Sequence, residues 1–245
     1  MAHFILKTKF KNAAKYFNQV ELKFAKGIKI DLNRFDIGHQ YLAFTGVYEN
    51  DLTKEILNLA SKASGLMVDV GANYGYYSLI WGIKNVNNKV ICFEASPKNL
   101  EAITNNIKNR LETQITLETN AVSDGKGKIY FDQGPAEQTG WGGISKDEEG
   151  NTTVEIETTS LDIYFAGDDI NIEVLKIDTE GADYLVIKGS KELLKNKRIQ
   201  HIFWEENIYR AKQLRLLGGE AAILLKEIEY VVNQIGDNEY HAFLA

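Results

Sequence analysis

The chain of 245 residues is poor in cysteine, which cross-links a fold, and in proline, which interrupts helices and strands: it has one cysteine and two prolines. A single cysteine cannot form an internal disulfide, and Cys92 lies in the apolar run "KVICFEA", which predicts a buried small side chain. No run of 18 apolar residues is present, so no membrane-spanning helix is expected. These absences favour a reducing compartment and a cytoplasmic location.

Basic residues are also in the minority, with 28 Lys and Arg against 34 Asp and Glu and a net charge of -6. Neutralising phosphates needs a basic surface, so nucleic acid is not an expected partner. The apolar fraction of 44% is that of globular proteins and allows a sizeable core. No linker rich in Gly, Ser or Pro divides the chain, and a homo-oligomer is compatible with these totals.

Residues 1–60 are predicted to form an N-terminal accessory segment of helix and short strands. Its first part carries a helical apolar stripe of Phe4, Ile5, Phe10, Ala14 and Phe17. Such a stripe packs on its own domain or, alternatively, touches a membrane surface or a partner. Short strands are expected near residues 28–32 and 41–47, and a helix over residues 52–61.

From residue 61 to residue 245, predicted strands and helices alternate. The expected strands are residues 66–70, 89–93, 115–119, 173–177, 199–204, 230–235 and 241–244. The expected helices are residues 74–84, a helix with Ser96 as its N-cap and Pro97 at its first position, a helix that Thr179 caps and that ends at Gly189, and residues 211–228. Residues 126–159 form a β-hairpin-rich insertion. The pattern predicts an α/β fold, doubly wound around a mostly parallel sheet, which binds ligands at the carboxyl ends of its strands.

The stretch "MVDVGANYGYYSL" places a glycine turn directly after the first buried strand of this unit. Gly71 and Gly75 permit a tight turn and the close approach of a ligand to the backbone. Glu94 ends the next strand, about 20 residues further on, where an acid suits hydrogen bonds to a ribose diol. Asp69, near the end of the first strand, faces a positive group or holds the loop. A nucleoside-binding site is therefore expected here.

The nicotinamide dinucleotide fingerprint does not fit this turn, because Asn73 stands at its middle position and Tyr76 where a further glycine is needed. Tyr184 and Lys188 have the spacing of short-chain dehydrogenases. Those enzymes, however, carry their glycine loop near the N-terminus and a serine well before the tyrosine. A nicotinamide oxidoreductase is therefore the less favoured alternative.

Five ordered motifs carry a family resemblance: "VDVGANYGYYSL", "CFEASPKNL", "NAVSDGKGKIYF", "TTSLD" and "LKIDTEGADYLVIKGS". Together they resemble the FkbM family of S-adenosylmethionine-dependent methyltransferases, from about Gly46 to Glu206. The resemblance implies a Rossmann-like class I methyltransferase that methylates a hydroxyl of a small molecule, sugar or glycan-type acceptor. It also implies cofactor contacts. Asp69, Gly71, Asn73 and Gly75 would line the amino-acid end, Glu94 would take the ribose hydroxyls, and Ala121, Ser123 and Asp124 would border the adenine.

Methyl transfer to a hydroxyl needs alignment of donor and acceptor and a group that helps to remove the proton. The crevice is expected between strands 66–70 and 173–177, where "KIDTEG" emerges. Asp178 and Glu180 are therefore the candidate catalytic residues, which orient the acceptor, one of them as base. The alternative is structural, with Glu180 complementing a helix dipole and Asp178 bonding loop amides.

Two further features are candidates for acceptor binding. Glu205 and Glu206 follow the next strand, and a variant of the hypothesis lets them join Asp178 around Mg²⁺ or Ca²⁺. The loop "QTGWGGISK" is rich in glycine and is expected to be mobile, with Trp141 stacking on a sugar or on adenine, or else standing at an incidental loop tip. A cofactor-binding partner subunit without catalysis remains the rival from another functional class.

Overall fold

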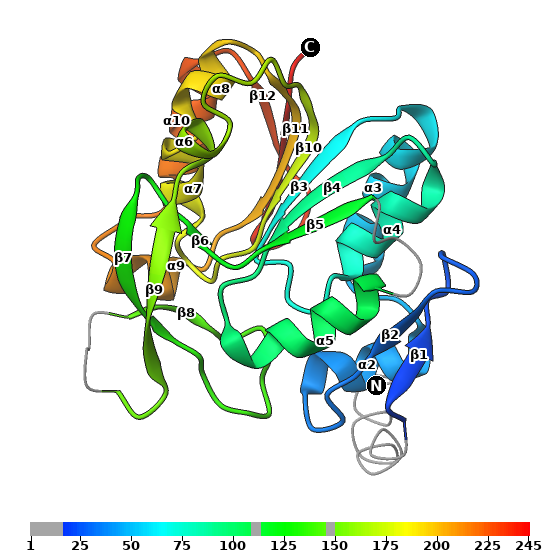
Figure 1. Ribbon diagram of the computed structural model, residues 1–245. Helices are drawn as coiled ribbons and strands as arrows, with labels where there is room; N and C mark the ends of the chain where they lie inside the picture. Colours follow the sequence, from blue (N-terminus) through cyan, green and yellow to red (C-terminus); the bar gives the residue numbers. More distant parts are fainter. Residues whose placement is uncertain (1–16, 109–113, 146–149) are drawn as a thin grey trace.

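The computed structural model describes residues 17–108, 114–145 and 150–245 (Figure 1). Phe4, Ile5, Phe10 and Ala14 of the expected apolar stripe lie outside these residues. Within them the strands form three sheets: seven strands in the order β12-β13-β11-β10-β3-β4-β5, four in the order β6-β9-β7-β8, and the pair β1-β2. No helix of this described part is both long enough and apolar enough to cross a bilayer.

The central sheet confirms the predicted doubly wound, mostly parallel arrangement. Its strands are β3 (Leu66–Val70), β4 (Lys89–Phe93), β5 (Ile115–Glu118), β10 (Ile172–Ile177), β11 (Ile199–Glu205), β12 (Val231–Gln234) and β13 (Glu239–Phe243). The first five pair with one another in parallel, and β13 pairs antiparallel with both β11 and β12. Each lies where the sequence predicted a strand.

Helices cover both faces of this sheet (Figure 1). One face carries α3 (Asn50–Lys62), α4 (Tyr76–Lys84) and α5 (Pro97–Lys108); the other carries α6 (Leu161–Tyr164), α7 (Asp183–Lys188), α8 (Lys191–Lys195) and α10 (Glu220–Glu227). The side chains of β3 supply both layers, because successive residues of a strand point to opposite faces. Met67 belongs to one buried cluster, and Val68 and Val70 belong to the other.

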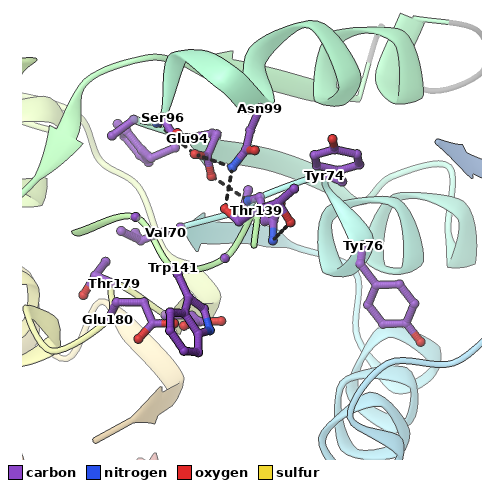
Figure 2. A pocket seen from close by; sticks show the side chains of 18 of the residues that line it. Val70, Tyr74, Tyr76, Glu94, Ser96, Asn99, Thr139, Trp141, Thr179 and Glu180 are labelled. Carbon is purple, nitrogen blue, oxygen red and sulfur yellow. Dashed lines mark hydrogen bonds between the residues drawn. The ribbon is translucent and has the colours of Figure 1, made fainter. Parts of the chain in front are cut away.

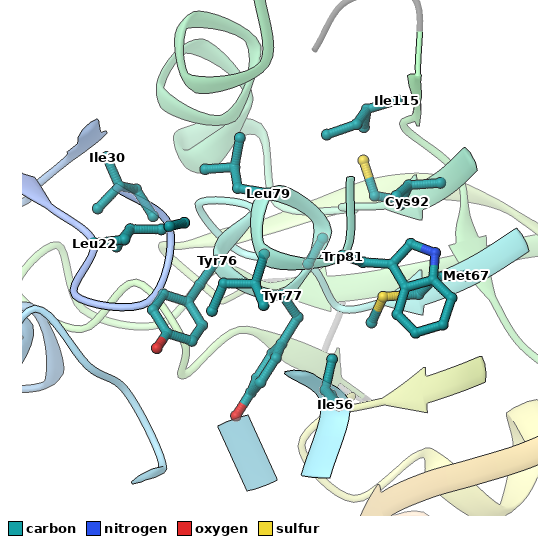
Figure 3. Close-up of a cluster of buried hydrophobic side chains, with 14 of the residues drawn as sticks. Leu22, Ile30, Ile56, Met67, Tyr76, Tyr77, Leu79, Trp81, Cys92 and Ile115 are labelled. Carbon is teal, nitrogen blue, oxygen red and sulfur yellow. The ribbon is translucent and has the colours of Figure 1, made fainter. Parts of the chain in front are cut away.

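The N-terminal segment shares the core of the first layer. It comprises β1 (Gln19–Glu21), β2 (Lys29–Asp31), α2 (Ile37–Thr45) and α3. Figure 3 shows Leu22, Ile30 and Ile56 in one buried cluster with Leu79 and Trp81 of α4. Burial of these apolar groups holds the segment against the sheet layer, and Cys92 is buried in the same cluster, as predicted.

The predicted insertion forms a second sheet beside the first. The insertion supplies β7 (Gly127–Asp132), β8 (Gly143–Ser145) and β9 (Thr153–Thr159), and β6 (Ala121–Val122), which precedes it in the chain, completes the sheet. Strand β7 pairs antiparallel with β8 and with β9, so the β-hairpin character expected of residues 126–159 is confirmed.

Two predicted elements differ from the structure. The strand expected at residues 41–47 is wrong: most of it belongs to helix α2, which Asp36 caps by accepting a hydrogen bond from the amide of His39 at 3.0 Å. The helix expected at residues 211–228 is two helices, α9 (Ile208–Gln213) and α10. Gly218 and Gly219 separate them with φ angles of 88° and 80°, which a right-handed helix does not accept.

Candidate active site

A cavity of about 220 Å³ lies at the carboxyl ends of β3, β4 and β10. Strand β3 is the point where the chain order reverses, since β4 and β5 follow on one side and β10 and β11 on the other. Open α/β sheets bind their ligands at such a switch point. The cavity wall also includes the loop of residues 138–142 and, from the N-terminal segment, Asp36, His39 and Tyr48.

The glycine turn after β3 is built for close packing of two loops. A Cβ atom on Gly71 would lie 1.9 Å from the carbonyl oxygen of Asp178, and the residue has a φ angle of 78°. From the sequence, this glycine is expected to permit a tight turn and the approach of a ligand, and the structure shows that the loop after β10 also needs the space. Asn73 has a φ angle of 53°, and Gly75, at 82°, is the N-cap of α4.

Glu94 anchors one end of the cavity (Figure 2). Its Oε2 accepts the amide of Asn73 at 2.6 Å, and its Oε1 accepts the amide of Ser96 at 2.9 Å and Nδ2 of Asn99 at 3.2 Å. Burial raises the pKa of Glu94 to about 7, although these three hydrogen bonds act in the opposite direction. The carboxyl group is therefore held in one orientation at the wall.

Beside Glu94, two buried polar atoms have no hydrogen-bond partner among the described residues: Oγ of Ser96 and Oδ1 of Asn99. Both residues line the cavity and are only 1% and 2% exposed. Ser96 was predicted to cap α5 with its side chain; this is wrong, although α5 does begin at Pro97. Buried polar atoms normally find partners, so the two atoms mark a place where a polar ligand fits.

The loop over the cavity is held by several hydrogen bonds in the structure, where the sequence suggested a mobile loop. The amide of Thr139 donates to Oδ2 of Asp36 at 2.5 Å, and its carbonyl accepts Nδ2 of Asn99 at 3.1 Å. Lys98 Nζ donates to the carbonyls of Gln133, Pro135 and Gln138. The N-terminal segment and α5 thus close the cavity together.

Carboxylates gather at the other end. Asp178 accepts a hydrogen bond from Nζ of Lys176 at 3.1 Å, and carboxylate oxygens of Glu49, Asp178 and Glu205 lie within 4.8 Å of one another. The hydroxyl of Tyr77 donates to Glu49 at 2.7 Å. Burial and the neighbouring Asp178 raise the pKa of both Glu49 and Glu205 to about 7. The cluster therefore combines the buried ammonium group of Lys176 with three carboxyl groups, of which those of Glu49 and Glu205 have a raised pKa.

Glu180 lies next to this cluster and contacts α9. Its Oε2 accepts Nδ2 of Asn207 at 2.9 Å and lies 3.7 Å from Nε of Arg210. Burial, followed by the charge of Asp178, raises the pKa of Glu180, while Arg210 acts against this shift. Figure 2 shows Glu180 and Trp141 away from the Glu94 group.

The loop between Asp178 and α7 is shaped by Asp183, not by Thr179. Helix α7 begins at Asp183, and the predicted capping role of Thr179 is wrong. The carboxylate of Asp183 instead accepts the amides of Thr179 and Gly181, each at 3.2 Å. Burial raises the pKa of Asp183 to about 7. This buried acid positions the backbone that carries the two candidate catalytic residues.

The predicted site residues fall into two groups. Those that line the cavity are Gly71, Asn73, Glu94, Ala121, Trp141, Asp178, Glu180 and Glu205. The structure places the remaining five elsewhere: Asp69, Gly75, Ser123, Asp124 and Glu206.

Each of these five has a structural setting of its own. Asp69 is 1% exposed and accepts the hydroxyl of Ser78, and Gly75 packs near Ile103. Ser123 lies against Gly189, Asp124 is paired with Lys188, and Glu206 accepts the amide of Gly219.

Sequence reasoning missed several residues of the site. Lys176 was inside the quoted motif, and its position two residues before Asp178 on a strand was a usable signal, since both side chains share one face. Asn99 also had a usable signal, because it lies in the first turn of α5, the helix that follows Glu94. Asp36 and Glu49 offered none, because only the folded N-terminal segment brings Asp36 to the cavity and Glu49 to the carboxylates of Asp178 and Glu205.

A doubly wound sheet with a glycine turn after one strand and an acid ending the next is the architecture of class I S-adenosylmethionine-dependent methyltransferases. The family model of the methyltransferase FkbM domain matches residues 69–230. The chain belongs to this family, as the motifs had suggested. Comparison with curated protein sequences finds no match.

Comparison with solved structures finds several methyltransferases of low sequence identity. A protein described as "putative caffeoyl-CoA O-methyltransferase" from Staphylococcus aureus superposes with a TM-score of 0.50 and 13% identity, over 80% of this chain and 82% of the other. For precorrin-6y C5,15-methyltransferase from Geobacter metallireducens the TM-score is 0.47 and the sequence identity is 14%, over 81% of this chain and 90% of the other. For a SAM-dependent O-methyltransferase from Thermotoga maritima the TM-score is 0.46 and the sequence identity is 12%, over 80% of this chain and 64% of the other. At these identities the likeness concerns the fold alone.

Proposed function

We propose that this protein transfers a methyl group from S-adenosylmethionine to a hydroxyl of a small-molecule, sugar or glycan-type acceptor. The family supports the methyltransferase class. The observation that carries the proposal is one cavity with two chemically different ends, a hydrogen-bonding end at Glu94 and a carboxylate end at Asp178. The lone buried thiol, Cys92, suits a reducing compartment, so the proposal places the protein in the cytoplasm.

The Glu94 end fits the nucleoside part of the cofactor. An ionised carboxylate offers about four lone-pair positions, and Glu94 uses two on Oε1 and one on Oε2. The remaining position on Oε2 is free to accept a ribose hydroxyl. Ser96 Oγ and Asn99 Oδ1, beside it, have no partner within the described part of the chain. Ala121 and the glycine turn give wall and backbone surface for the base and the amino-acid part.

Bound S-adenosylmethionine would supply a methyl group made electrophilic by the positive sulfonium to which it is attached. The carboxylates of Asp178 and its neighbours place negative potential at this end of the cavity, which favours a cation nearby. The same groups face the place where an acceptor hydroxyl has to lie. Alignment of the two reactants is then the main contribution of the walls.

Asp178 and Glu180 remain the proposed catalytic pair. Lys176 Nζ donates to Asp178 at 3.1 Å and holds its carboxylate at the cavity wall, where Asp178 would accept the hydroxyl proton as the oxygen–methyl bond forms. Glu180, held by Asn207 and Arg210, is positioned to accept a second hydrogen bond from the acceptor. Loss of rate on EDTA treatment, restored by Mg²⁺, would instead favour a metal-assisted variant at the three clustered carboxylates.

Calorimetry and a methyl-transfer assay test the proposal together. S-adenosylhomocysteine should bind and NAD should not, which separates the methyltransferase from an oxidoreductase. Turnover with labelled methyl donor and fractionated metabolites as acceptors separates an enzyme from a silent partner subunit. Failure of S-adenosylhomocysteine to bind would refute the cofactor assignment.

The catalytic role is tested at Asp178. In Asp178→Asn and Asp178→Ala, turnover should fall by at least about a hundredfold, the usual contribution of a general base. The affinity for S-adenosylhomocysteine and the melting temperature of the asparagine variant should stay close to those of the wild type. Unchanged turnover in the asparagine variant would rule out Asp178 as the base.

A further inference from the structure

A second hollow of about 950 Å³ opens beside the cavity. Trp141, Ile144, Glu180 and Glu205 line both, so the hollow leads to the carboxylate end of the cavity. Its other side is formed largely by α9, which contributes Tyr209 and Gln213 among others. We call this hollow the α9 groove. An acceptor lying in it could extend one group toward Glu180 and Glu205.

The wall of the α9 groove is held together by Arg210. Its Nη2 donates to the carbonyl of Trp141 at 2.8 Å, and its Nε lies 3.7 Å from Oε2 of Glu180. A Cβ atom on Gly143 would lie 2.8 Å from Nη1, so the guanidinium fits closely against β8. The loop with Trp141, strand β8 and the loop after β10 are therefore fixed relative to α9.

Two aromatic side chains of the groove are exposed: Trp141 at 53% and Tyr209 at 76%. Exposed rings beside a hollow offer flat apolar faces whose negative π surface attracts polarised C–H groups. Between and around them lie planar polar groups, the amides of Asn207 and Gln213 and the carboxylates of Glu180 and Glu205. Such groups donate and accept hydrogen bonds in defined directions. Ring faces combined with planar polar groups suit a ligand with a C–H face and many hydroxyls.

Charge narrows the choice of ligand. Among the described residues that line the groove, Arg210 is the single cationic side chain, and it is already paired with Glu180. Asp132, Glu180 and Glu205 are acidic. A phosphate, a coenzyme A ester or a nucleic acid would meet carboxylates without a cation to neutralise it. A lipid chain would meet mainly polar groups, at a cost in desolvation.

We propose that the α9 groove binds a neutral carbohydrate, with sugar rings against Tyr209 and Trp141 and the hydroxyl to be methylated at the inner end by Glu180 and Glu205. The inference rests on the proposed function and narrows its acceptor to one chemical class. Asn207 is placed to orient this end, because its Nδ2 holds Glu180 and its Oδ1 accepts the amide of Arg210.

The test uses the full chain with S-adenosylhomocysteine on an array of oligosaccharides that contains neutral hexoses, deoxyhexoses, N-acetylhexosamines and uronic acids. Retention of a neutral sugar is expected. Saturation-transfer NMR with that sugar should then show Tyr209→Ala binding about fivefold to tenfold more weakly, as for loss of one aromatic contact. Tyr209→Phe, which keeps the ring, should bind as the wild type does. Leu217→Ala is the matched control, since Leu217 is 80% exposed and lies outside the groove lining.

The outcomes separate this inference from the proposed function. If S-adenosylhomocysteine binds but no sugar is retained, or only uronic acids are, the carbohydrate assignment falls and the methyltransferase proposal stands. Equal sugar binding by Tyr209→Ala and wild type would place the sugar outside the α9 groove and overturn the inference. If S-adenosylhomocysteine itself does not bind, both fail.

Discussion

Glu94 and Glu205 line one cavity, and the carboxylate of Glu49 lies beside Glu205 and Asp178 at its end. Burial raises the pKa of each of the three glutamate carboxyl groups to about 7. At the scale of single residues, the site is thus a set of acids whose charge changes near neutral pH. Lys176, fully buried beside Asp178, is the ammonium group that balances part of this charge. Ligand affinity should therefore report the protonation of particular residues.

The affinity for S-adenosylhomocysteine should increase as the pH rises through 7. In the proposed complex a ribose hydroxyl donates to ionised Glu94, and protonation of a carboxyl group with a pKa of about 7 removes that acceptor. Calorimetry should give binding up to about tenfold weaker at pH 6 than at pH 8, because most Glu94 is protonated at the lower value. Glu94→Gln should flatten the profile. A wild-type affinity that is constant, or that falls with pH, would contradict the contact.

At this scale the sequence predicted the acids that end regular strands and missed those that depend on the fold. Glu94 and Asp178 were found because each follows a recognisable strand. Glu205 and Glu206 were not distinguishable, since neighbouring residues at a strand end point to different sides and only Glu205 lines the cavity. Glu49 reaches the site from the N-terminal segment, a contact that no local pattern encodes.

At the scale of elements, the site depends on how closely the loops after β3 and β10 approach. The amide of Asp178 donates to the carbonyl of Val70 at 2.9 Å, and the missing side chain of Gly71 leaves room for the carbonyl of Asp178. The glycine turn after β3 and the candidate base Asp178 are therefore in direct contact through their backbones.

Gly71→Ala should destabilise the protein and displace Asp178. Alanine at a φ angle of 78° costs about 1–2 kcal/mol, and the contact at 1.9 Å adds to this cost because its partner is backbone. Chemical denaturation should show the loss in the free energy of unfolding, together with weaker S-adenosylhomocysteine binding. Gly125→Ala is the control, because a Cβ there meets nothing within 4 Å. Equal behaviour of the two variants would refute the close approach.

Strands and helices were predicted correctly where the apolar pattern was strong. The prediction failed where a capping residue or a glycine break determined where a helix begins or ends. The buried strands of the central sheet were predictable, because a strand that is covered on both faces has a continuous run of apolar residues. The sequence of helix α2 resembles a strand because the helix has only nine residues, too few for a clear helical period of apolar positions. Asp36 is nevertheless a usable capping signal. The break between α9 and α10 has a signal in the sequence, because two consecutive glycines, Gly218 and Gly219, disfavour a continuous helix.

At the scale of the whole molecule, the N-terminal segment belongs to the same hydrophobic core as the methyltransferase sheet. Ile56 is fully buried in the cluster that contains Met67 and Trp81, and Asp36 of the same segment bonds the loop over the cavity. The family resemblance leaves the first 40 residues out, and no local pattern predicted that Asp36 would bond the loop over the cavity.

Ile56→Ala should therefore lower the free energy of unfolding of the entire chain by about 2–5 kcal/mol, the cost of a buried large-to-small substitution. Circular dichroism and S-adenosylhomocysteine binding should be lost in one transition on denaturation. Ile223→Ala, at a 59% exposed position, should change little. Separate transitions, or a small effect at Ile56, would indicate that the segment is only loosely attached.

The most direct measurement is a crystal structure of the protein with S-adenosylhomocysteine. We expect the ribose hydroxyls within hydrogen-bond distance of Glu94, polar contacts from Ser96 and Asn99, and the sulfur directed toward Asp178 and Glu180. The ligand bound outside this cavity, or inside it with the ribose away from Glu94, would contradict the account.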